Sequence, residues 1–219
     1  MNAVLPEHIR HVAIEGAIGV GKTTLCHLLA SRFRARLVLE EAEENPFLPR
    51  FYEHRSAYAF QTQLWFLVSR YRQLSNAFLQ EDLFHPVALA DYMFAKDRIF
   101  ASVNLDEDEL ALYDTVARSL ERDIVKPDFV VFLQASTDVL MKRIAKRGRP
   151  FEYDMDLAYI EVINDAYNHF FFHYTESPVL IINTSDIDFV DRPADLEELV
   201  AQIAEAKPGV RFFHPVSKP

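Results

Sequence analysis

Cysteine, glycine and long apolar runs are scarce in this chain. The single cysteine, Cys26, can form no internal disulfide, which indicates a reducing compartment. No apolar run approaches the ~18 residues that a helix needs to cross a bilayer, and residues 1–10 lack the apolar core of a signal peptide. We therefore expect a cytoplasmic protein that has no membrane partner.

Positive charge is also in short supply. The 219 residues include 23 lysines and arginines against 33 aspartates and glutamates, which gives a formal net charge of −10. Because proteins that bind nucleic-acid polymers usually carry a basic face, this balance argues against such a partner. A single nucleotide stays compatible, since its phosphates need only a local positive pocket. The length favours one domain over residues 1–219.

Short apolar runs alternate with longer amphipathic stretches. The runs are four to six residues long and several are rich in valine and isoleucine, which is typical of buried parallel strands. They are His11–Ile14, Arg36–Leu39, Pro86–Ala90, Phe129–Leu133 and Pro178–Ile182. The stretches between them predict helices at Lys22–Phe33, Glu107–Arg122, Thr137–Lys146, Leu157–Tyr174 and Ala194–Ala206. This alternation predicts an α/β fold with helices on both faces of the sheet and ligands at the carboxyl ends of its strands.

One further stretch predicts a long helix. Its apolar residues are spaced 4, 3, 4, 3 and 4 apart, at Phe60, Leu64, Leu67, Tyr71, Leu74 and Phe78. Trp65, Phe66 and Val68 widen the apolar stripe, so the helix is expected to pack on two sides. One of those sides is available to a second subunit, and we expect a homodimer formed through long helices.

Three of the five glycines lie within Gly16–Gly21, in the segment Gly16-x-x-x-x-Gly21-Lys22-Thr23. This segment follows the first predicted strand and opens the first helix, where backbone N–H groups and the helix dipole favour phosphate oxygens. In such a P-loop the lysine reaches the β/γ-phosphates and the threonine hydroxyl ligates Mg²⁺. A chance match is roughly one in a hundred from average composition, which makes a plain glycine turn the weaker interpretation. The predicted ATP-binding residues here are Gly16, Ala17, Ile18, Gly19, Val20, Gly21, Lys22, Thr23 and Thr24.

Further motifs follow the P-loop in a fixed order. They are Ile14-Glu15-Gly16, Glu40-Glu41 with Asn45-Pro46-Phe47-Leu48, Phe51-Tyr52, Thr62-Gln63-Leu64-Trp65-Phe66, and Arg143 with Arg147-Gly148-Arg149. From the P-loop to about Phe189 the chain resembles the deoxynucleoside kinases, and more closely their bacterial deoxyadenosine/deoxyguanosine branch. The resemblance implies a three-layer α/β/α P-loop kinase fold with a five-stranded parallel sheet and a helical lid at about 143–155. It also implies ATP-dependent phosphorylation of a deoxynucleoside 5′-hydroxyl in nucleotide salvage.

Glu41 follows the second predicted strand, at the edge of the sheet where chemistry is expected. By the resemblance, Glu41 is the general base that takes the proton from the 5′-hydroxyl, and Glu40 is the alternative. Without the resemblance, the favoured interpretation of Glu41 is one more acid in the solvated cluster Glu40–Glu44.

Gln63 and Arg70 are seven residues apart and therefore share one face of the long helix. By the resemblance this pair hydrogen-bonds the base, Asp97 fixes the arginine and faces the base, and Tyr52 and Glu152 meet the sugar 3′-hydroxyl. The alternative is a polar flank on an amphipathic helix and a tyrosine in the core. The likeness favours a purine substrate, deoxyguanosine or deoxyadenosine, followed by deoxycytidine.

Arg143, Arg147 and Arg149 lie at the end of a predicted helix, where cations also complement the helix dipole. By the resemblance, Arg147 and Arg149 are catalytic lid residues that neutralise charge on the transferred phosphoryl group. Arg143 is then expected to stack on the adenine of ATP, with Asp188 and Phe189 on its other side.

The third predicted strand ends in Asp91-Tyr92-Met93, where the family typically has an acid followed by arginine and serine. Asp91 keeps the acid that holds Mg²⁺ through water, but the arginine is absent. Arg98 and Arg55 are the candidates for supplying the missing charge. Tyr92 and Met93 are otherwise packing residues after a strand.

Two other functions are compatible with the sequence. A nucleoside-monophosphate kinase needs a second cationic site for its acceptor phosphate, and Arg50, Arg55 and Arg70 are available for one. The second is a non-catalytic kinase-like subunit that keeps ATP as a structural ligand, because the change at Tyr92 removes a charge from the reacting site.

Overall fold

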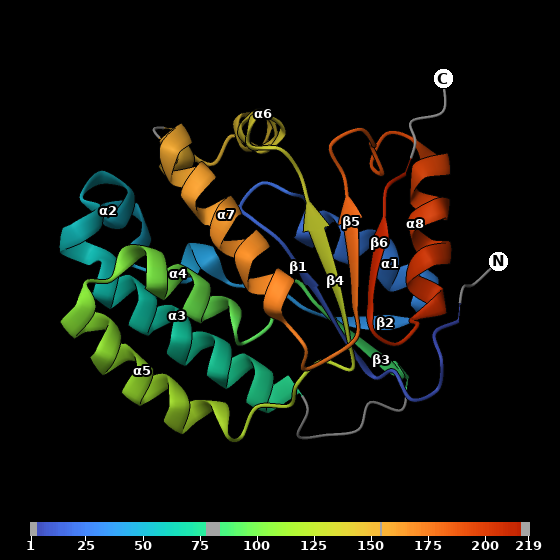
Figure 1. Cartoon of the computed structure of the whole chain (residues 1–219), viewed down its shortest axis with the longest axis horizontal. Helices are drawn as coiled ribbons and strands as arrows, with labels where there is room; N and C mark the ends of the chain where they lie inside the picture. The colour runs from blue at the N-terminus through green and yellow to red at the C-terminus, as the bar shows by residue number, and fades with distance from the viewer. Residues whose placement is uncertain (1–3, 78–83, 154, 216–219) are drawn as a thin grey trace.

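A computed structural model of the chain describes residues 4–77, 84–153 and 155–215. Its sheet has six strands, all paired in parallel, in the order β2-β3-β1-β4-β5-β6 (Figure 1). The strands are β1 (His11–Glu15), β2 (Ala35–Val38), β3 (Val87–Ala90), β4 (Phe129–Gln134), β5 (Val179–Asn183) and β6 (Val210–Phe213). All five predicted strands are present. The prediction of a five-stranded sheet is wrong, because β6 adds a sixth strand beside β5.

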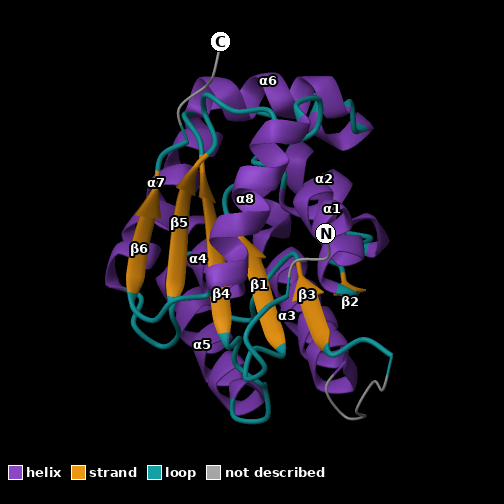
Figure 2. Cartoon of the chain, turned by 90° about the vertical axis from the view of Figure 1, so that its right-hand side faces the viewer, coloured by secondary structure: helices purple, strands orange, loops and turns teal. Residues whose placement is uncertain are grey.

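The helices form a layer on each face of this sheet. The helix α1 (Lys22–Phe33) packs with α8 (Pro193–Glu205) on one face, and α3, α4, α5 and α7 cover the other (Figures 1 and 2). Their bounds are α3 (Arg55–Ala77), α4 (Lys96–Asn104), α5 (Glu107–Glu121) and α7 (Leu157–His173). The helix α6 (Thr137–Arg147) lies across the carboxyl end of the sheet, while α2 (Leu48–Glu53) packs beside α3 (Figure 2). The expected three-layer α/β/α architecture is therefore confirmed. Phe78, the last residue of the predicted long helix, lies outside the described residues.

The core is built from the strands β1, β3, β4 and β5, which are buried on both faces. Val12, Ile14, Leu89, Val131 and Ile182 are all fully buried. Burying such a side chain contributes about 1.5–3 kcal/mol, so the valine- and isoleucine-rich runs stabilise the sheet strongly. A second, smaller cluster lies between α3, α4 and α5 and comprises Leu67, Leu74, Tyr92, Phe94, Ala101 and Tyr113.

The strand order brings the ends of β2, β3 and β1 side by side. Asp91 follows β3, and its backbone N–H donates to the carbonyl of Val38 at the end of β2 (3.2 Å). The Asp91 carboxylate in turn accepts the backbone N–H of Glu40 at 2.8 Å. Because Gly16 follows β1, the P-loop meets these two acids at the carboxyl edge of the sheet. Within the described residues, no helix is long and apolar enough to cross a membrane.

Candidate active site

The P-loop adopts a backbone path that requires glycine. Gly16 has φ 146°, and a Cβ there would lie 2.4 Å from the carbonyl oxygen of Leu133. Gly21 has φ 106°, and its Cβ would lie 2.9 Å from the ring of Phe189. Side chains at these positions would collide with the neighbouring strand or loop, which explains why the scarce glycines gather here.

Lys22 opens α1 and its side chain folds back over the P-loop. Its Nζ donates to the carbonyl of Gly16 at 2.7 Å. Burial and then the nearby charge of Lys96 lower the pKa of Lys22 to about 8, although Glu15 and Glu40 act in the opposite direction. Burial thus disfavours the charged form of Lys22, and an anionic ligand would stabilise that form.

Thr23 and Asp91, the two predicted metal ligands, are in contact. The Thr23 hydroxyl donates to Asp91 Oδ2, and the other carboxylate oxygen accepts the backbone N–H of Glu40. Hydroxyl and carboxylate oxygens are the donors that Mg²⁺ prefers, and Mg²⁺ usually completes its shell with water and phosphate oxygens. This pair therefore fits a magnesium ion bound together with a nucleotide.

A cleft between the P-loop and the loop after β5, here called the donor cleft, contains most of the predicted ATP-binding residues. Its predicted members are Gly19, Val20, Gly21, Lys22, Thr23, Thr24, Arg143, Asp188 and Phe189. The guanidinium of Arg143 donates to the carbonyls of Val20 (3.1 Å) and Thr184 (2.8 Å). Arg143 thus ties the P-loop to the β5 loop and forms one wall of the cleft.

A second cavity, here called the acceptor pocket, opens between α3, α4 and the lid. The predicted substrate residues that line it are Tyr52, Gln63, Arg70 and Glu152. Gln63 is only 3% exposed, and among the described residues its Oε1 has no hydrogen-bond partner. The ring of Tyr52 stacks on Phe151, with 5.9 Å between centroids. A buried amide oxygen without a partner is costly, so Gln63 is suited to a polar ligand.

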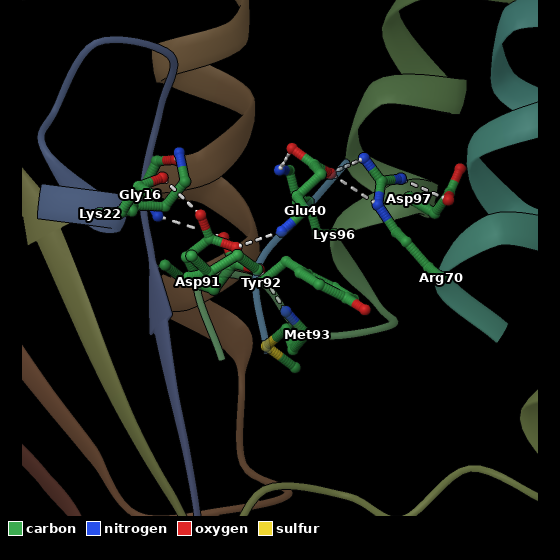
Figure 3. A network of polar contacts seen from close by, with 12 residues as sticks. Gly16, Lys22, Glu40, Arg70, Asp91, Tyr92, Met93, Lys96 and Asp97 are labelled. Carbon is green, nitrogen blue, oxygen red and sulfur yellow. Dashed lines mark hydrogen bonds and ion pairs between the residues drawn. The ribbon is translucent and has the colours of Figure 1, made fainter. Parts of the chain in front are cut away.

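Arg70 is held between two acids. Its Nε donates to Glu40 Oε1 at 2.8 Å, and its Nη1 forms an ion pair with Asp97 (Figure 3). Asp97 is 1% exposed and is not among the residues that line the pocket, so the structure shows it holding the arginine, while its contact with the base stays a prediction. Burial raises the pKa of Asp97, and the Arg70 charge counteracts that shift.

The predicted lid runs from the end of α6 into the short helix η2 (Pro150–Glu152). Arg147 donates twice to Glu152, at 3.0 and 2.6 Å. Arg149 pairs with Glu43, at 3.1 Å, and so joins the lid to the segment after β2. Asp154, within the expected lid at 143–155, lies outside the described residues.

The donor cleft and the acceptor pocket share one wall. The residues that line both are Gly19, Lys22, Thr23, Arg147 and Arg149. A phosphate chain in the donor cleft would therefore end at the mouth of the acceptor pocket. Four of the shared residues offer it a positive charge or a hydroxyl group there. This is the arrangement that direct phosphoryl transfer needs.

Comparison with known proteins agrees with this geometry. The sequence matches the family model described as deoxynucleoside kinase over residues 12–207. The chain belongs to the deoxynucleoside kinase family. A deoxyguanosine kinase of Bacillus subtilis (strain 168) is 36% identical over 201 residues, covering 89% of this chain and 96% of that protein. A deoxyguanosine kinase of Lactobacillus acidophilus is 29% identical and covers 89% of each chain.

Solved structures show the same relationship. A deoxyadenosine kinase from M. mycoides with bound dATP superposes with a TM-score of 0.76 at 25% identity, covering 90% of this chain and 99% of that chain. The same enzyme with bound dCTP gives a TM-score of 0.75. As a deoxynucleoside kinase the chain is a transferase that uses a nucleotide.

Glu41, the expected base of this deoxynucleoside kinase, is not in the acceptor pocket. Its side chain is exposed and lines a separate groove on the outer side of α3, whereas the neighbouring Glu40 enters the pocket. The strand β2 ends at Val38, and Glu41 is the cap residue of the short helix η1 (Ala42–Glu44), so the chain has left the strand conformation there. Of the two adjacent glutamates, the one in the pocket is therefore Glu40, the alternative left open by the sequence.

Tyr92 and Met93 are packing residues. Tyr92 is fully buried in the cluster between α3, α4 and α5, and its hydroxyl donates to Gln73 at 2.7 Å. Met93 is 3% exposed, and its backbone N–H donates to Glu15 at 2.7 Å. The position where this family typically has an arginine is thus part of the core in this chain.

Neither arginine proposed as the replacement cation lies in the pocket. Arg98 has a half-exposed side chain and pairs with Asp114 at 2.7 Å, while Arg55 lies 3.9 Å from the ring centroid of Tyr159. A cation that does line the pocket is Lys96, which is 4% exposed. The sequence did not predict a role for Lys96, because it did not predict the helix α4. The indication it offered was that Lys96 lies shortly after Asp91, the acid at the end of the third strand.

Proposed function

We propose that this chain transfers the γ-phosphoryl group of ATP to the 5′-hydroxyl of a purine deoxynucleoside in nucleotide salvage. The observation that carries the proposal is the junction of the donor cleft and the acceptor pocket at Lys22 and the lid arginines. The relatives named deoxyguanosine kinase and deoxyadenosine kinase support the purine preference. A relative named deoxyadenosine/deoxycytidine kinase supports deoxycytidine as the next candidate.

Glu40 is the proposed base. Burial alone would raise the pKa of Glu40, but Arg70 and Lys96 hold it well below its usual range, so the carboxylate stays ionised at neutral pH. The 5′-hydroxyl oxygen bonds to the γ-phosphorus as its proton passes to Glu40, and the bond to the β-phosphate oxygen breaks with its electron pair leaving on ADP. Because such transition states are loose, orienting the hydroxyl matters more than a strongly basic carboxylate.

Gln63 and Arg70 are proposed to recognise the base from the same face of α3. An amide offers both a donor and an acceptor, which matches the edge of a purine bidentately. The guanidinium of Arg70 also lies 4.6 Å from the ring centroid of Phe66, which lines the pocket as an apolar wall. Tyr52 and Glu152 are proposed to meet the sugar 3′-hydroxyl.

Thr23 and Asp91 are proposed to hold Mg²⁺, which neutralises charge on the β- and γ-phosphates when bound. Arg147 and Arg149 are proposed to act on the same charge from the lid. Arg143, Asp188 and Phe189 are proposed to enclose the adenine of ATP at the far end of the donor cleft.

We also propose a homodimer formed through the long helices. An apolar groove on the outer side of α3 supports this, and it is lined by Phe47, Phe60, Leu64, Trp65 and Val68. A cytoplasmic location fits the buried free thiol of Cys26. Light scattering after size-exclusion chromatography tests the dimer, and a mass equal to one chain of 25.4 kDa would contradict it.

A substrate panel tests the proposed function. Purified protein is incubated with ATP and Mg²⁺ and with each deoxynucleoside or its monophosphate, and ADP formation is measured. We expect deoxyguanosine or deoxyadenosine to give the highest kcat/KM. Activity on monophosphates alone would overturn the proposal. The structure disfavours that outcome, because among Arg50, Arg55 and Arg70 only Arg70 lines the pocket and two acids already hold it.

A further inference from the structure

Lys96 lies where the acceptor pocket approaches the P-loop. Its Nζ donates to Glu40 Oε2 at 2.8 Å, and its side chain is 4% exposed. Figure 3 shows Lys96 beside Glu40, with Asp91 on one side and Arg70 on the other. We propose that Lys96 is a catalytic residue that contacts the transferred phosphoryl group while it holds the base carboxylate. This inference rests on the proposed function.

Lys96 and Lys22 both line the acceptor pocket, and Lys22 also lines the donor cleft. Glu40, which Lys96 holds, lines the same pocket. A phosphoryl group that passes from the donor cleft to the acceptor pocket therefore enters a space lined by two ammonium groups, which favour an anion.

The geometry of an ammonium group permits this double role. Lys96 has three N–H donors, and only one bond, to Glu40, is needed to position the carboxylate. The remaining donors can meet a non-bridging oxygen of the phosphoryl group. Lys96 keeps its protons throughout, because the hydroxyl proton goes to Glu40 and the electron pair of the broken bond leaves on ADP. The lysine thus holds the Glu40 carboxylate on one side of the attacking 5′-hydroxyl oxygen and the phosphoryl group on the other.

A purely structural role for Lys96 is the competing explanation. Glu40, Asp97, Arg70 and Lys96 form a buried group with two negative and two positive charges, in which Lys96 balances the total. In that case its removal would lower stability and leave the chemistry of the folded protein alone. The two explanations therefore differ in kcat.

Three variants separate them. Lys96→Met removes the charge and Lys96→Arg keeps it. Arg98→Met, two residues along the same helix on its exposed side, is the matched control. We expect Lys96→Met to reduce kcat by about 10²–10³-fold, as for loss of a donor to a developing charge, while ATP affinity and nucleoside KM change less than threefold. Lys96→Arg recovers part of the rate, and Arg98→Met stays within threefold of the wild type.

Thermal midpoints establish that the variants are folded, and Lys96→Gln replaces Lys96→Met should that variant not fold.

The possible results are distinct. A wild-type protein that phosphorylates deoxynucleosides, with Lys96→Met within threefold of its kcat, overturns the role of Lys96 alone. An effect confined to nucleoside KM also overturns it. A wild-type protein that phosphorylates no deoxynucleoside overturns the proposed function, and the inference falls with it.

Discussion

Glu40 and Glu41 offer a direct test of the site, because only Glu40 lines the acceptor pocket. We expect Glu40→Gln to reduce kcat by about 10²–10⁴-fold, the range for removal of a general base. Glutamine has nearly the same shape and keeps one oxygen that can accept from Arg70. We expect Glu41→Gln to stay within threefold of the wild type, because Glu41 lies in a different groove.

Stability must be followed in the same experiment. Glu40 bonds two buried cations, and leaving a buried charge without its partner costs about 3–5 kcal/mol. The Glu40 side chain is 18% exposed and the amide oxygen still accepts a hydrogen bond, so we expect about 1–3 kcal/mol. Urea unfolding gives this value, and ADP release with deoxyguanosine gives kcat for the folded fraction.

The opposite pattern would refute the assignment. If Glu41→Gln lost activity while Glu40→Gln kept it, the base would be Glu41 and the acceptor pocket would have to rearrange when substrates bind. Equal losses in both variants would show that position in the pocket does not decide the role.

Three further predictions concern affinity and stability. The affinity for ATP should not change with pH below about pH 8 and should fall by up to tenfold per pH unit above it. The reason is that the pKa of Lys22 is about 8 in the free protein, so above this pH the lysine must take up a proton before it binds phosphate. Isothermal titration in buffers of different ionisation enthalpy measures this uptake, and a flat response to pH 9.5 would contradict it. Gln63→Leu should raise KM for deoxyguanosine by about 10–100-fold through the loss of one or two hydrogen bonds, and an unchanged KM in steady-state kinetics would place the base elsewhere. Tyr92→Arg should destabilise the fold by several kcal/mol, since it buries an unpaired charge in an aromatic cluster. Tyr92→Phe should lose only about 1 kcal/mol with its bond to Gln73, and equal urea midpoints for the two variants would argue against this packing role.

Local patterns in the sequence were sufficient for most of the fold. The strands β1 to β5 coincide with short, mostly apolar runs, and Gly16–Thr23 has a spacing that few other structures require. The strand β6 gave no such signal, because it lies at the sheet edge and its residues Val210–Phe213 alternate between exposed and half-buried. The helix α4 has nine residues and no repeating apolar stripe long enough to reveal it.

The site was harder to predict because its decisive contacts are distant in sequence. Lys96 and Glu40 are 56 residues apart, and nothing near either residue indicates the other. The choice between Glu40 and Glu41 depends on where β2 ends to within one residue, which is finer than a sequence pattern can resolve. The sequence showed that Tyr92 stands where an arginine was expected. It did not show that Lys96 supplies a cation to the pocket, because the helix α4 had not been predicted.

The bond between Arg147 and Glu152 has a consequence for the control of wasteful hydrolysis. In this structure the lid carries its own counter-ion, since Glu152 occupies two donors of the arginine that is proposed to stabilise the reaction. A nucleoside 3′-hydroxyl that bonded to Glu152, as proposed above, would compete for the same oxygens. Arg147 would then have donors to offer to the phosphates when an acceptor is bound.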